Sequence, residues 1–145
     1  MIEPLINPTD AELDALTALW EASVRATHDF LAPDDIGFYR SAVRRQALLQ
    51  TALYVIRQEK GSFAAFTGID GDKIEMLFVA PDLRGRGLGR RLVQYAIDRC
   101  GARRVDCNEQ NTLAAQFYAR LGFRIAARDA LDSADRPYPI LHFVL

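Results

Sequence analysis

The chain has 145 residues, half of them hydrophobic, and its 18 basic and 19 acidic residues leave a net charge of -1. This length suits one domain with a sizeable core, and the composition excludes both a disordered chain and a general nucleic-acid-binding surface. We therefore expect a single domain over residues 1–145 that has no nucleic-acid partner. The first residues lack the features of a signal peptide, and no apolar run approaches about 18 residues, so we expect a cytoplasmic protein without a membrane span.

The first elements can be predicted from local signals. A short strand over Ile2–Ile6 is expected at a sheet edge, because Pro4 lacks a backbone donor. Thr9 and Glu12 form a capping-box pattern that begins a helix, and the chain breaks at 27–33. The buried face of this helix is predicted to hold Leu13, Leu16, Trp20 and Val24.

A second helix is expected from Asp34 to about Leu49, with Phe38, Val43 and Ala47 on its inner side. The elements predicted after it are a hairpin of Leu53–Arg57 and Gly61–Thr67, a turn over Gly68–Gly71, a strand over Ile74–Val79, a helix from Gly87 to Cys100, a strand over Arg103–Cys107, a helix from Asn111 to Leu121, and strands over Phe123–Arg128 and Pro139–Leu145. The predicted class is α/β, with about seven strands and four helices in the order β-α-α-β-β-β-α-β-α-β-β.

The segment Arg84–Gly89 joins the strand at 74–79 to the helix that follows. Gly87 and Gly89 lack Cβ, so an anion can approach the main chain, and the unpaired amides of the first helical turn point at it. Arg84 and Arg86 add positive charge. These residue types at this spacing indicate a phosphate-binding loop. A charged turn without a ligand would fit the six residues equally well.

Two other phosphate motifs are excluded. A P-loop needs Lys and Ser or Thr after the last glycine, where this chain has Arg90 and Arg91. The dinucleotide motif needs a third glycine, and Arg90 stands in its place. Because no aromatic residues are interleaved with these arginines, the basic segment indicates a site for one polyphosphate ligand rather than an RNA surface.

The segment Arg84–Gly89 resembles the R-x-x-G-x-G loop of the GCN5-related N-acetyltransferases, the GNAT superfamily, through Arg84, Gly87 and Gly89. A second motif, 108–123, resembles the superfamily pattern N-x-x-A-x-x-F-Y-x-x-x-G-F. Short segments at 26–31, 108–111 and 137–141 are similar to those of small bacterial acetyltransferases of the YjaB type. The resemblance covers essentially the whole chain.

The resemblance implies a GNAT fold and direct transfer of an acetyl group from acetyl-CoA to a primary amine. In this superfamily the strand before the loop splays from its parallel neighbour, and the cofactor arm fills the gap. The residues expected at the cofactor are Leu77, Phe78, Val79, Arg84, Gly85, Arg86, Gly87, Leu88, Gly89, Arg90, Asn111 and Tyr118. No metal is expected, since Cys100 and Cys107 indicate neither a metal site nor a disulfide framework.

Tyr118 is the candidate acid that protonates the departing thiolate. On a helix, Leu113, Phe117 and Leu121 form a predicted core stripe, while Asn111, Ala115 and Tyr118 share a neighbouring face that a ligand could follow. The alternative for Tyr118 is a ring in the core with its hydroxyl in water.

Glu75 is the candidate base. Strict alternation would place it on the same side as Leu77 and Val79, facing either the cofactor gap or a solvated sheet surface. A water chain to bulk solvent is the alternative base.

His28 and Phe30 are expected in the acceptor pocket, between the first two helices. The neutral His28 imidazole could accept a proton near pH 7, or it could merely cap a helix and hold the loop.

The leading prediction is an acetyl-CoA-dependent N-acetyltransferase that acts on a small amine or a peptide amine. The alternatives are an acyl-CoA-binding regulatory module without transfer activity and an inert interaction domain. Which amine is acetylated cannot be read from these residues, and a homodimer is suggested only by the frequency of dimers in similar families.

Overall fold

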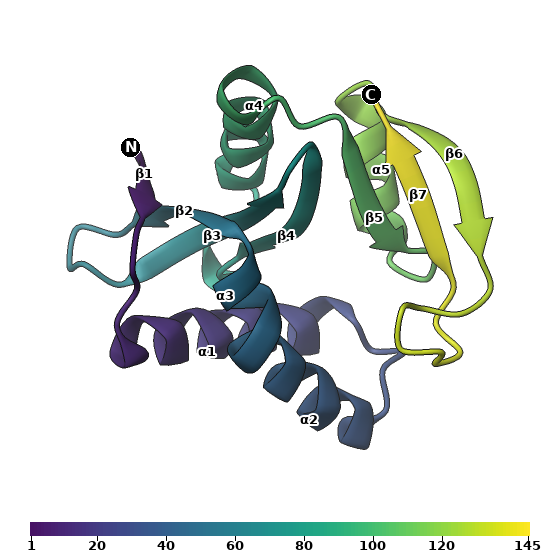
Figure 1. Cartoon of the computed structure of the whole chain (residues 1–145), viewed down its shortest axis with the longest axis horizontal. Coiled ribbons are helices and arrows are strands. Elements are labelled where there is room, and N and C mark those ends of the chain that lie inside the picture. Colours follow the sequence, from purple (N-terminus) through teal and green to yellow (C-terminus); the bar gives the residue numbers. More distant parts are fainter.

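A seven-stranded mixed sheet forms the centre of the computed structural model, which describes residues 1–145. The strand order is β1-β2-β3-β4-β5-β7-β6, in which β4 and β5 run parallel and all other neighbours are antiparallel (Figure 1). The strands are β1 (Ile2–Leu5), β2 (Ala52–Arg57), β3 (Phe63–Asp70), β4 (Lys73–Val79), β5 (Arg104–Asn108), β6 (Arg124–Asp129) and β7 (Ile140–Val144). The helices are α1 (Asp10–Thr27), α2 (Pro33–Ala42), a π-helical turn (Val43–Ala47), α3 (Leu48–Gln50), a 3₁₀ turn (Pro81–Leu83), α4 (Leu88–Cys100) and α5 (Thr112–Arg120). The predicted fold class and element order are confirmed, with α2, the π-helical turn and α3 forming the predicted second helix.

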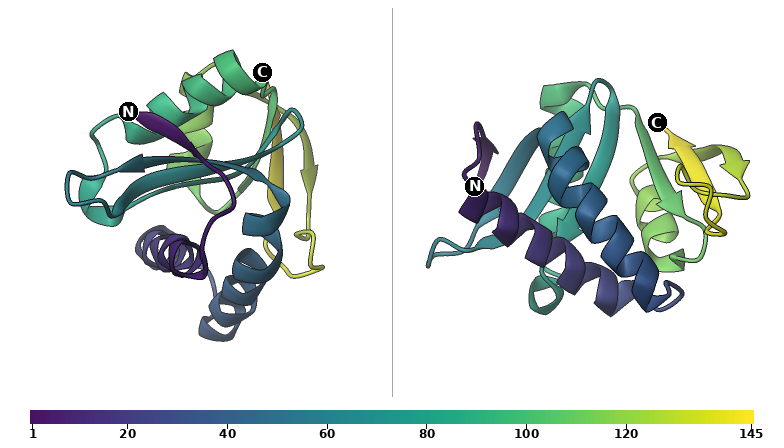
Figure 2. Two further views of the ribbon diagram at one scale, coloured as in Figure 1. Left: turned by 60° about the vertical axis from the view of Figure 1, so that its left-hand side comes forward. Right: turned by 60° about the horizontal axis from the view of Figure 1, so that its bottom comes forward.

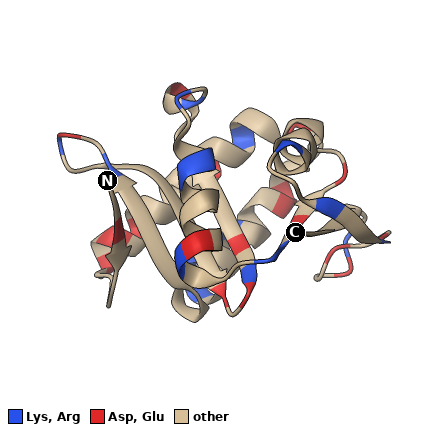
Figure 3. Cartoon of the chain, turned by 90° about the horizontal axis from the view of Figure 1, so that it is seen from above, with Lys and Arg blue, Asp and Glu red and all other residues tan.

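Helices cover both faces of the sheet (Figure 2). On one face, Leu16 of α1 packs in a core that also contains Phe66 of β3. On the other face, Val93 of α4 packs with Phe143 of β7. Acidic and basic residues are interspersed along the ribbon in Figure 3, which fits the small net charge. None of the helices is both long and apolar enough to cross a membrane.

The N-terminal predictions are confirmed. β1 is an edge strand, and α1 begins at a capping box in which Glu12 N donates to Thr9 Oγ1 at 3.1 Å and Thr9 N donates to Glu12 Oε1 at 2.9 Å. These two bonds satisfy amides that the first helical turn leaves free. The predicted inner face of α1 is buried as expected.

The second helix differs from its prediction in two respects. It begins at Pro33, and a π-helical turn interrupts it at Val43–Ala47, which shifts the helical register. Phe38, predicted on the inner side, is 42% exposed, and the Arg136 guanidinium stacks 3.9 Å from its ring centroid. The prediction for Phe38 is therefore wrong, because a distant loop supplies its partner. Ile36 is buried instead, while Val43 is buried as predicted.

The predicted turn at Gly68–Gly71 is also wrong in part. β3 continues through Gly68 to Asp70, and the chain reverses only at Gly71. Gly68 is a glycine for packing reasons, since a Cβ there would lie 2.6 Å from Met76 Cε and 2.7 Å from Thr51 Oγ1. The lack of space around residue 68 therefore explains this glycine, which the sequence pattern had placed in a turn.

A bulge in β4 shapes the part of the sheet that holds the site. Gly68 pairs with Met76 and Ile69 pairs with Ile74, so Glu75 has no partner on β3. Such an extra residue breaks the alternation of side chains and increases local twist. Ile74 consequently packs in the core under α4, whereas Met76 packs in the core against α1. The prediction that Glu75 shares a side with Leu77 and Val79 assumed an uninterrupted strand, and the bulge removes that assumption.

Beyond the bulge, β4 and β5 separate. Only Lys73 with Arg104 and Ile74 with Val105 are paired between them. Met76, Leu77, Phe78 and Val79 have partners on β3 but none on β5, and Glu75 is paired with neither strand. The predicted splay of the two parallel strands is therefore present in the structure (Figure 1).

Candidate active site

A cleft of about 480 Å³ opens where β4 and β5 diverge. It lies between the end of α1, the loop before α4, and the start of α5. Its lining consists of Ser23, Thr27, His28, Ile74, Glu75, Met76, Leu77, Phe78, Val79, Leu83, Arg84, Gly85, Gly87, Leu88, Gly89, Arg90, Val105, Asp106, Cys107, Asn108, Asn111, Leu113, Ala114, Phe117 and Tyr118. Most of the predicted site residues are thus brought together. Arg86 and Phe30 are the exceptions, since neither contributes to the lining.

The loop before α4 presents free amides to the cleft. Gly85 and Gly87 have φ values of 76° and 80°, in the left-handed region where glycine carries no steric penalty. The first backbone bond of α4 runs from Arg91 N to Gly87 O at 3.0 Å. The amides of residues 84–90 donate to no group in the chain. Unpaired N–H groups at the positive end of a helix fit a diphosphate such as that of coenzyme A.

Arg84 connects this loop to α1. Its Nη2 donates to the Ser23 carbonyl oxygen at 3.2 Å, so part of the guanidinium is already bonded within the chain. Arg90 also lines the cleft, whereas Arg86 is exposed outside it. Arg84 and Arg90 are therefore the arginines placed to meet an anion there.

Tyr118 is the most buried residue of α5 and also lines the cleft. Its ring centroid lies 5.2 Å from that of Phe117, 5.8 Å from that of Phe123 and 5.9 Å from that of Phe143. The Tyr118 hydroxyl has no hydrogen-bond partner in the chain and is not among the fully buried unpartnered atoms, of which Arg136 Nε is the only one. Burial raises the pKa of Tyr118 well above its ordinary value, so the hydroxyl keeps its proton at neutral pH.

Two predictions for α5 are wrong. Leu113, predicted in the core stripe, is 71% exposed at the mouth of the cleft. Ala114 rather than Ala115 lines the cleft. Asn111 is the N-cap of α5, and its Oδ1 accepts from Ala114 N at 3.2 Å. Its amide nitrogen is not used by this cap.

Cys107 and Asn108 were not predicted as site residues. Cys107 Sγ lies 3.3 Å from the Asn108 carbonyl oxygen, and burial raises the pKa of this thiol to about 11. The thiol is therefore protonated and unreactive at neutral pH. Asn108 belongs to the same motif, 108–123, as Asn111, so the sequence did contain a signal that could have identified it as a site residue. Ser23 and Thr27, also missed, share one face of α1 by their spacing of four.

Glu75 reaches the cleft as the first member of a charged network. Lys73 Nζ lies 3.5 Å from Glu75 Oε1 and 2.8 Å from Asp106 Oδ2. His142 Nδ1 lies 2.7 Å from Asp106, and its Nε2 lies 2.7 Å from Asp129. Asp129 and Asp106 raise the pKa of His142. No group of three or more His, Cys, Asp or Glu side chains is placed to hold a metal ion.

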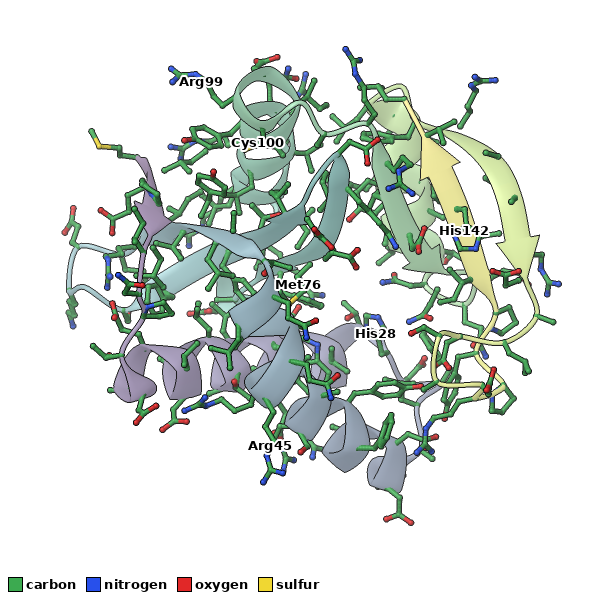
Figure 4. The ribbon with its side chains drawn as sticks, viewed as in Figure 1. His28, Arg45, Met76, Arg99, Cys100 and His142 are labelled. Atoms are coloured by element: carbon green, nitrogen blue, oxygen red, sulfur yellow. The ribbon has the colours of Figure 1, made fainter.

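His28 is the C-cap of α1 and lines the cleft (Figure 4). Burial, and then the charge of Arg84, lower its pKa to about 4. The imidazole is consequently neutral at pH 7. Phe30 does not line the cleft but packs against the His28 ring, with 5.1 Å between the centroids and 45° between the ring planes. The other neighbour of Phe30 is Tyr138, at 6.0 Å.

The fold and the cleft match what the predicted resemblance implied. The family model described as an acetyltransferase (GNAT) domain matches residues 49–125. The chain therefore belongs to the GNAT family of acetyltransferases. Family membership confirms the predicted resemblance and the predicted enzyme class, an N-acetyltransferase that uses acetyl-CoA.

Among characterised proteins, the chain is similar to the peptidyl-lysine N-acetyltransferases YjaB of Salmonella typhimurium and Escherichia coli. Identity to the Salmonella protein is 34% over 136 residues, which are 92% of this chain and 91% of that protein. Identity to the Escherichia coli protein is 36% over 134 residues, which are 90% of this chain and 88% of that protein. The solution structure of the apo form of YjaB from Escherichia coli superposes with a TM-score of 0.87 at 33% identity, covering 99% of this chain and 95% of that one.

Proposed function

We propose that the protein transfers the acetyl group of acetyl-CoA to the ε-amino group of a lysine in a peptide or protein, by direct attack of the amine on the thioester. The characterised relatives, at 34% and 36% identity over most of the chain, are named for this acceptor. The observation that carries the proposal is the cleft itself, which has free amides at one end and the Tyr118 hydroxyl inside it.

Acetyl-CoA would lie along the unpaired side of β4. The diphosphate would accept from the free amides of 84–90, with Arg84 and Arg90 beside it. The pantetheine arm would run past Leu77, Phe78 and Val79, where β4 lacks a partner on β5. Backbone groups of an open strand edge are strong hydrogen-bonding groups, and they would polarise the thioester carbonyl.

Tyr118 would act as the acid. When the tetrahedral intermediate collapses, the C–S bond breaks and the sulfur needs a proton or an equivalent partner. A buried phenol that remains protonated at neutral pH is able to supply it. The packing of the ring against Phe117, Phe123 and Phe143 would hold the hydroxyl in one place.

Glu75 would draw a cationic acceptor into the cleft, and it is also a candidate base. Its carboxylate lies next to Lys73 Nζ, at 3.5 Å. A proton on Glu75 would remove its attraction to Lys73, which Asp106 also holds at 2.8 Å. This competition favours an electrostatic role for Glu75 over proton transfer.

The test is incubation of the protein with acetyl-CoA and a panel of lysine-containing peptides, followed by mass spectrometry for the gain of one acetyl group. Acetylated lysine together with release of free CoA is expected. Tyr118→Phe provides the control for a reaction that depends on the site. Tight binding of acetyl-CoA without transfer to any amine would indicate an acyl-CoA-binding module and refute the proposal.

A further inference from the structure

Thr27, in the last turn of α1, determines which nitrogen of His28 carries the proton. The Thr27 hydroxyl oxygen lies 2.7 Å from the Ser23 carbonyl oxygen and 2.7 Å from His28 Nδ1. A carbonyl oxygen only accepts, so the single hydroxyl proton is donated to Ser23. Thr27 Oγ1 must then accept from Nδ1–H of His28. The neutral imidazole therefore has its proton on Nδ1 and its lone pair on Nε2.

The Nε2 lone pair has no partner in the chain. His28 lines the cleft, and its only side-chain hydrogen bond is the one made by Nδ1 on the α1 side. Arg136 Nε is the only fully buried polar side-chain atom without a partner, so His28 Nε2 is accessible. Phe30 packs on the ring and Tyr138 packs on Phe30, which limits rotation of the imidazole.

Burial first, and then the charge of Arg84, keep His28 neutral. Arg84 approaches from the loop after β4 and donates to the same Ser23 carbonyl that accepts from Thr27. Asp29, on the loop that carries His28, acts in the opposite direction but is outweighed by burial and by Arg84. The lone pair is therefore available over the whole neutral pH range.

We propose that His28 Nε2 accepts the proton of the acceptor nitrogen during acetyl transfer. This inference rests on the proposed function. The acceptor reaches the thioester as a neutral amine, having lost one proton to solvent. As the new C–N bond forms, the nitrogen becomes cationic, and one N–H proton passes to Nε2. The C–S bond then breaks, and the thiolate takes the Tyr118 proton. Proton return from His28 to Tyr118 through solvent restores both groups.

A neutral imidazole suits this step better than Glu75 does. A nitrogen that has just attacked a carbonyl is a stronger acid than a free ammonium ion, and the neutral imidazole offers a lone pair at Nε2 to take its proton. Nε2 needs to break no ion pair in the chain, whereas Glu75 is held by Lys73. The imidazolium formed would also be destabilised by Arg84, which favours rapid return of the proton.

The tautomer can be measured directly by long-range ¹H–¹⁵N correlation spectra of the imidazoles. The chain has two histidines, His28 and His142, and His142→Gln assigns the signals. We expect His28 to show a protonated Nδ1 and an unprotonated Nε2 between pH 6 and 9. Thr27→Val should reduce this tautomer, and Thr27→Ser should restore it. A protonated Nε2 in the wild-type protein at pH 7 would overturn the inference.

Kinetics test the proton transfer itself. The glutamine in His28→Gln keeps an acceptor oxygen but cannot hold a proton, so we expect kcat to fall by about 100-fold, with KM for the lysine peptide within about threefold. Calorimetry should show unchanged affinity for acetyl-CoA. A kcat for His28→Gln within about threefold of the wild type would refute the role of His28 and leave the proposed function standing. Absence of transfer by the wild-type protein would remove the proposed function, and this inference with it.

Discussion

The substitution Gly89→Ala should raise the stability of the free protein slightly and lower its affinity for the cofactor. Gly89 is the second residue of α4 and has no positive φ. A Cβ there would lie 3.5 Å from Phe117 Cζ and 3.7 Å from Val79 Cγ2, which are ordinary van der Waals contacts. The free protein therefore accepts alanine, which should stabilise the helix by about 0.5 kcal/mol and raise Tm by about 2 °C.

The same methyl group would enter the cleft, because Phe117 and Val79 both line it. We expect the affinity for acetyl-CoA to fall at least about tenfold, which corresponds to about 1.4 kcal/mol. Thermal melts and calorimetry with acetyl-CoA measure the two effects separately. Wild-type affinity in Gly89→Ala would refute the placement of the cofactor against this amide.

Gly61→Ala is the matched control for this experiment. Gly61 lies in the hairpin between β2 and β3, where an added Cβ would meet open space, and its φ is 90°. Alanine there should lower stability by about 1 kcal/mol through backbone strain. Because Gly61 is not part of the cleft, affinity for acetyl-CoA should not change.

Three further predictions follow from particular contacts. Tyr118→Phe should lower kcat by at least about 100-fold in an assay of CoA release and leave Tm nearly unchanged, since the hydroxyl has no bond to lose; wild-type turnover would remove its role as the acid. His142→Gln removes a histidine whose pKa Asp129 and Asp106 raise above 6.5 in the folded protein. A histidine with a raised folded pKa stabilises the fold fully at pH values below its unfolded pKa, and this contribution to the free energy of unfolding is lost as pH rises through the folded pKa. The Tm difference from the wild type should thus be larger at pH 6 than at pH 9, and an equal difference would contradict the pairing. Gly68→Ala should destabilise the fold by about 1–3 kcal/mol in denaturant titrations, because its Cβ would overlap the Met76 side chain; wild-type stability would show that the side chain moves away freely.

The sequence predicted the elements whose causes are local. The capping box at Thr9 and Glu12 fixes the start of α1 through bonds within one turn. Gly101 ends α4 in a left-handed conformation, with φ at 70°. The loop at 84–90 could be predicted for the same reason, because glycines and a helix start determine where its amides point.

The failed predictions have causes far away in the chain. Phe38 follows the inner-face periodicity, yet Arg136 from the loop between β6 and β7 stacks on it and keeps it near the surface. Leu113 fits a core stripe, but α5 lies at the edge of the cleft, where no other element covers that position. These partners are far apart in the sequence, so the periodicity of one helix cannot predict the contacts between them.

The bulge at Glu75 is the feature of the fold on which the site depends most. A single unpaired residue in β4 limits its pairing with β5 to Lys73 and Ile74. The strand beyond it then has backbone donors and acceptors that no neighbouring strand satisfies, at the place where the amides of residues 84–90 are also free. A ligand with amide groups in its arm and a diphosphate at its end would satisfy both sets at once. Binding of acetyl-CoA should consequently stabilise the whole sheet, by about 2.7 kcal/mol at a concentration of 100 Kd, and not only order the loop.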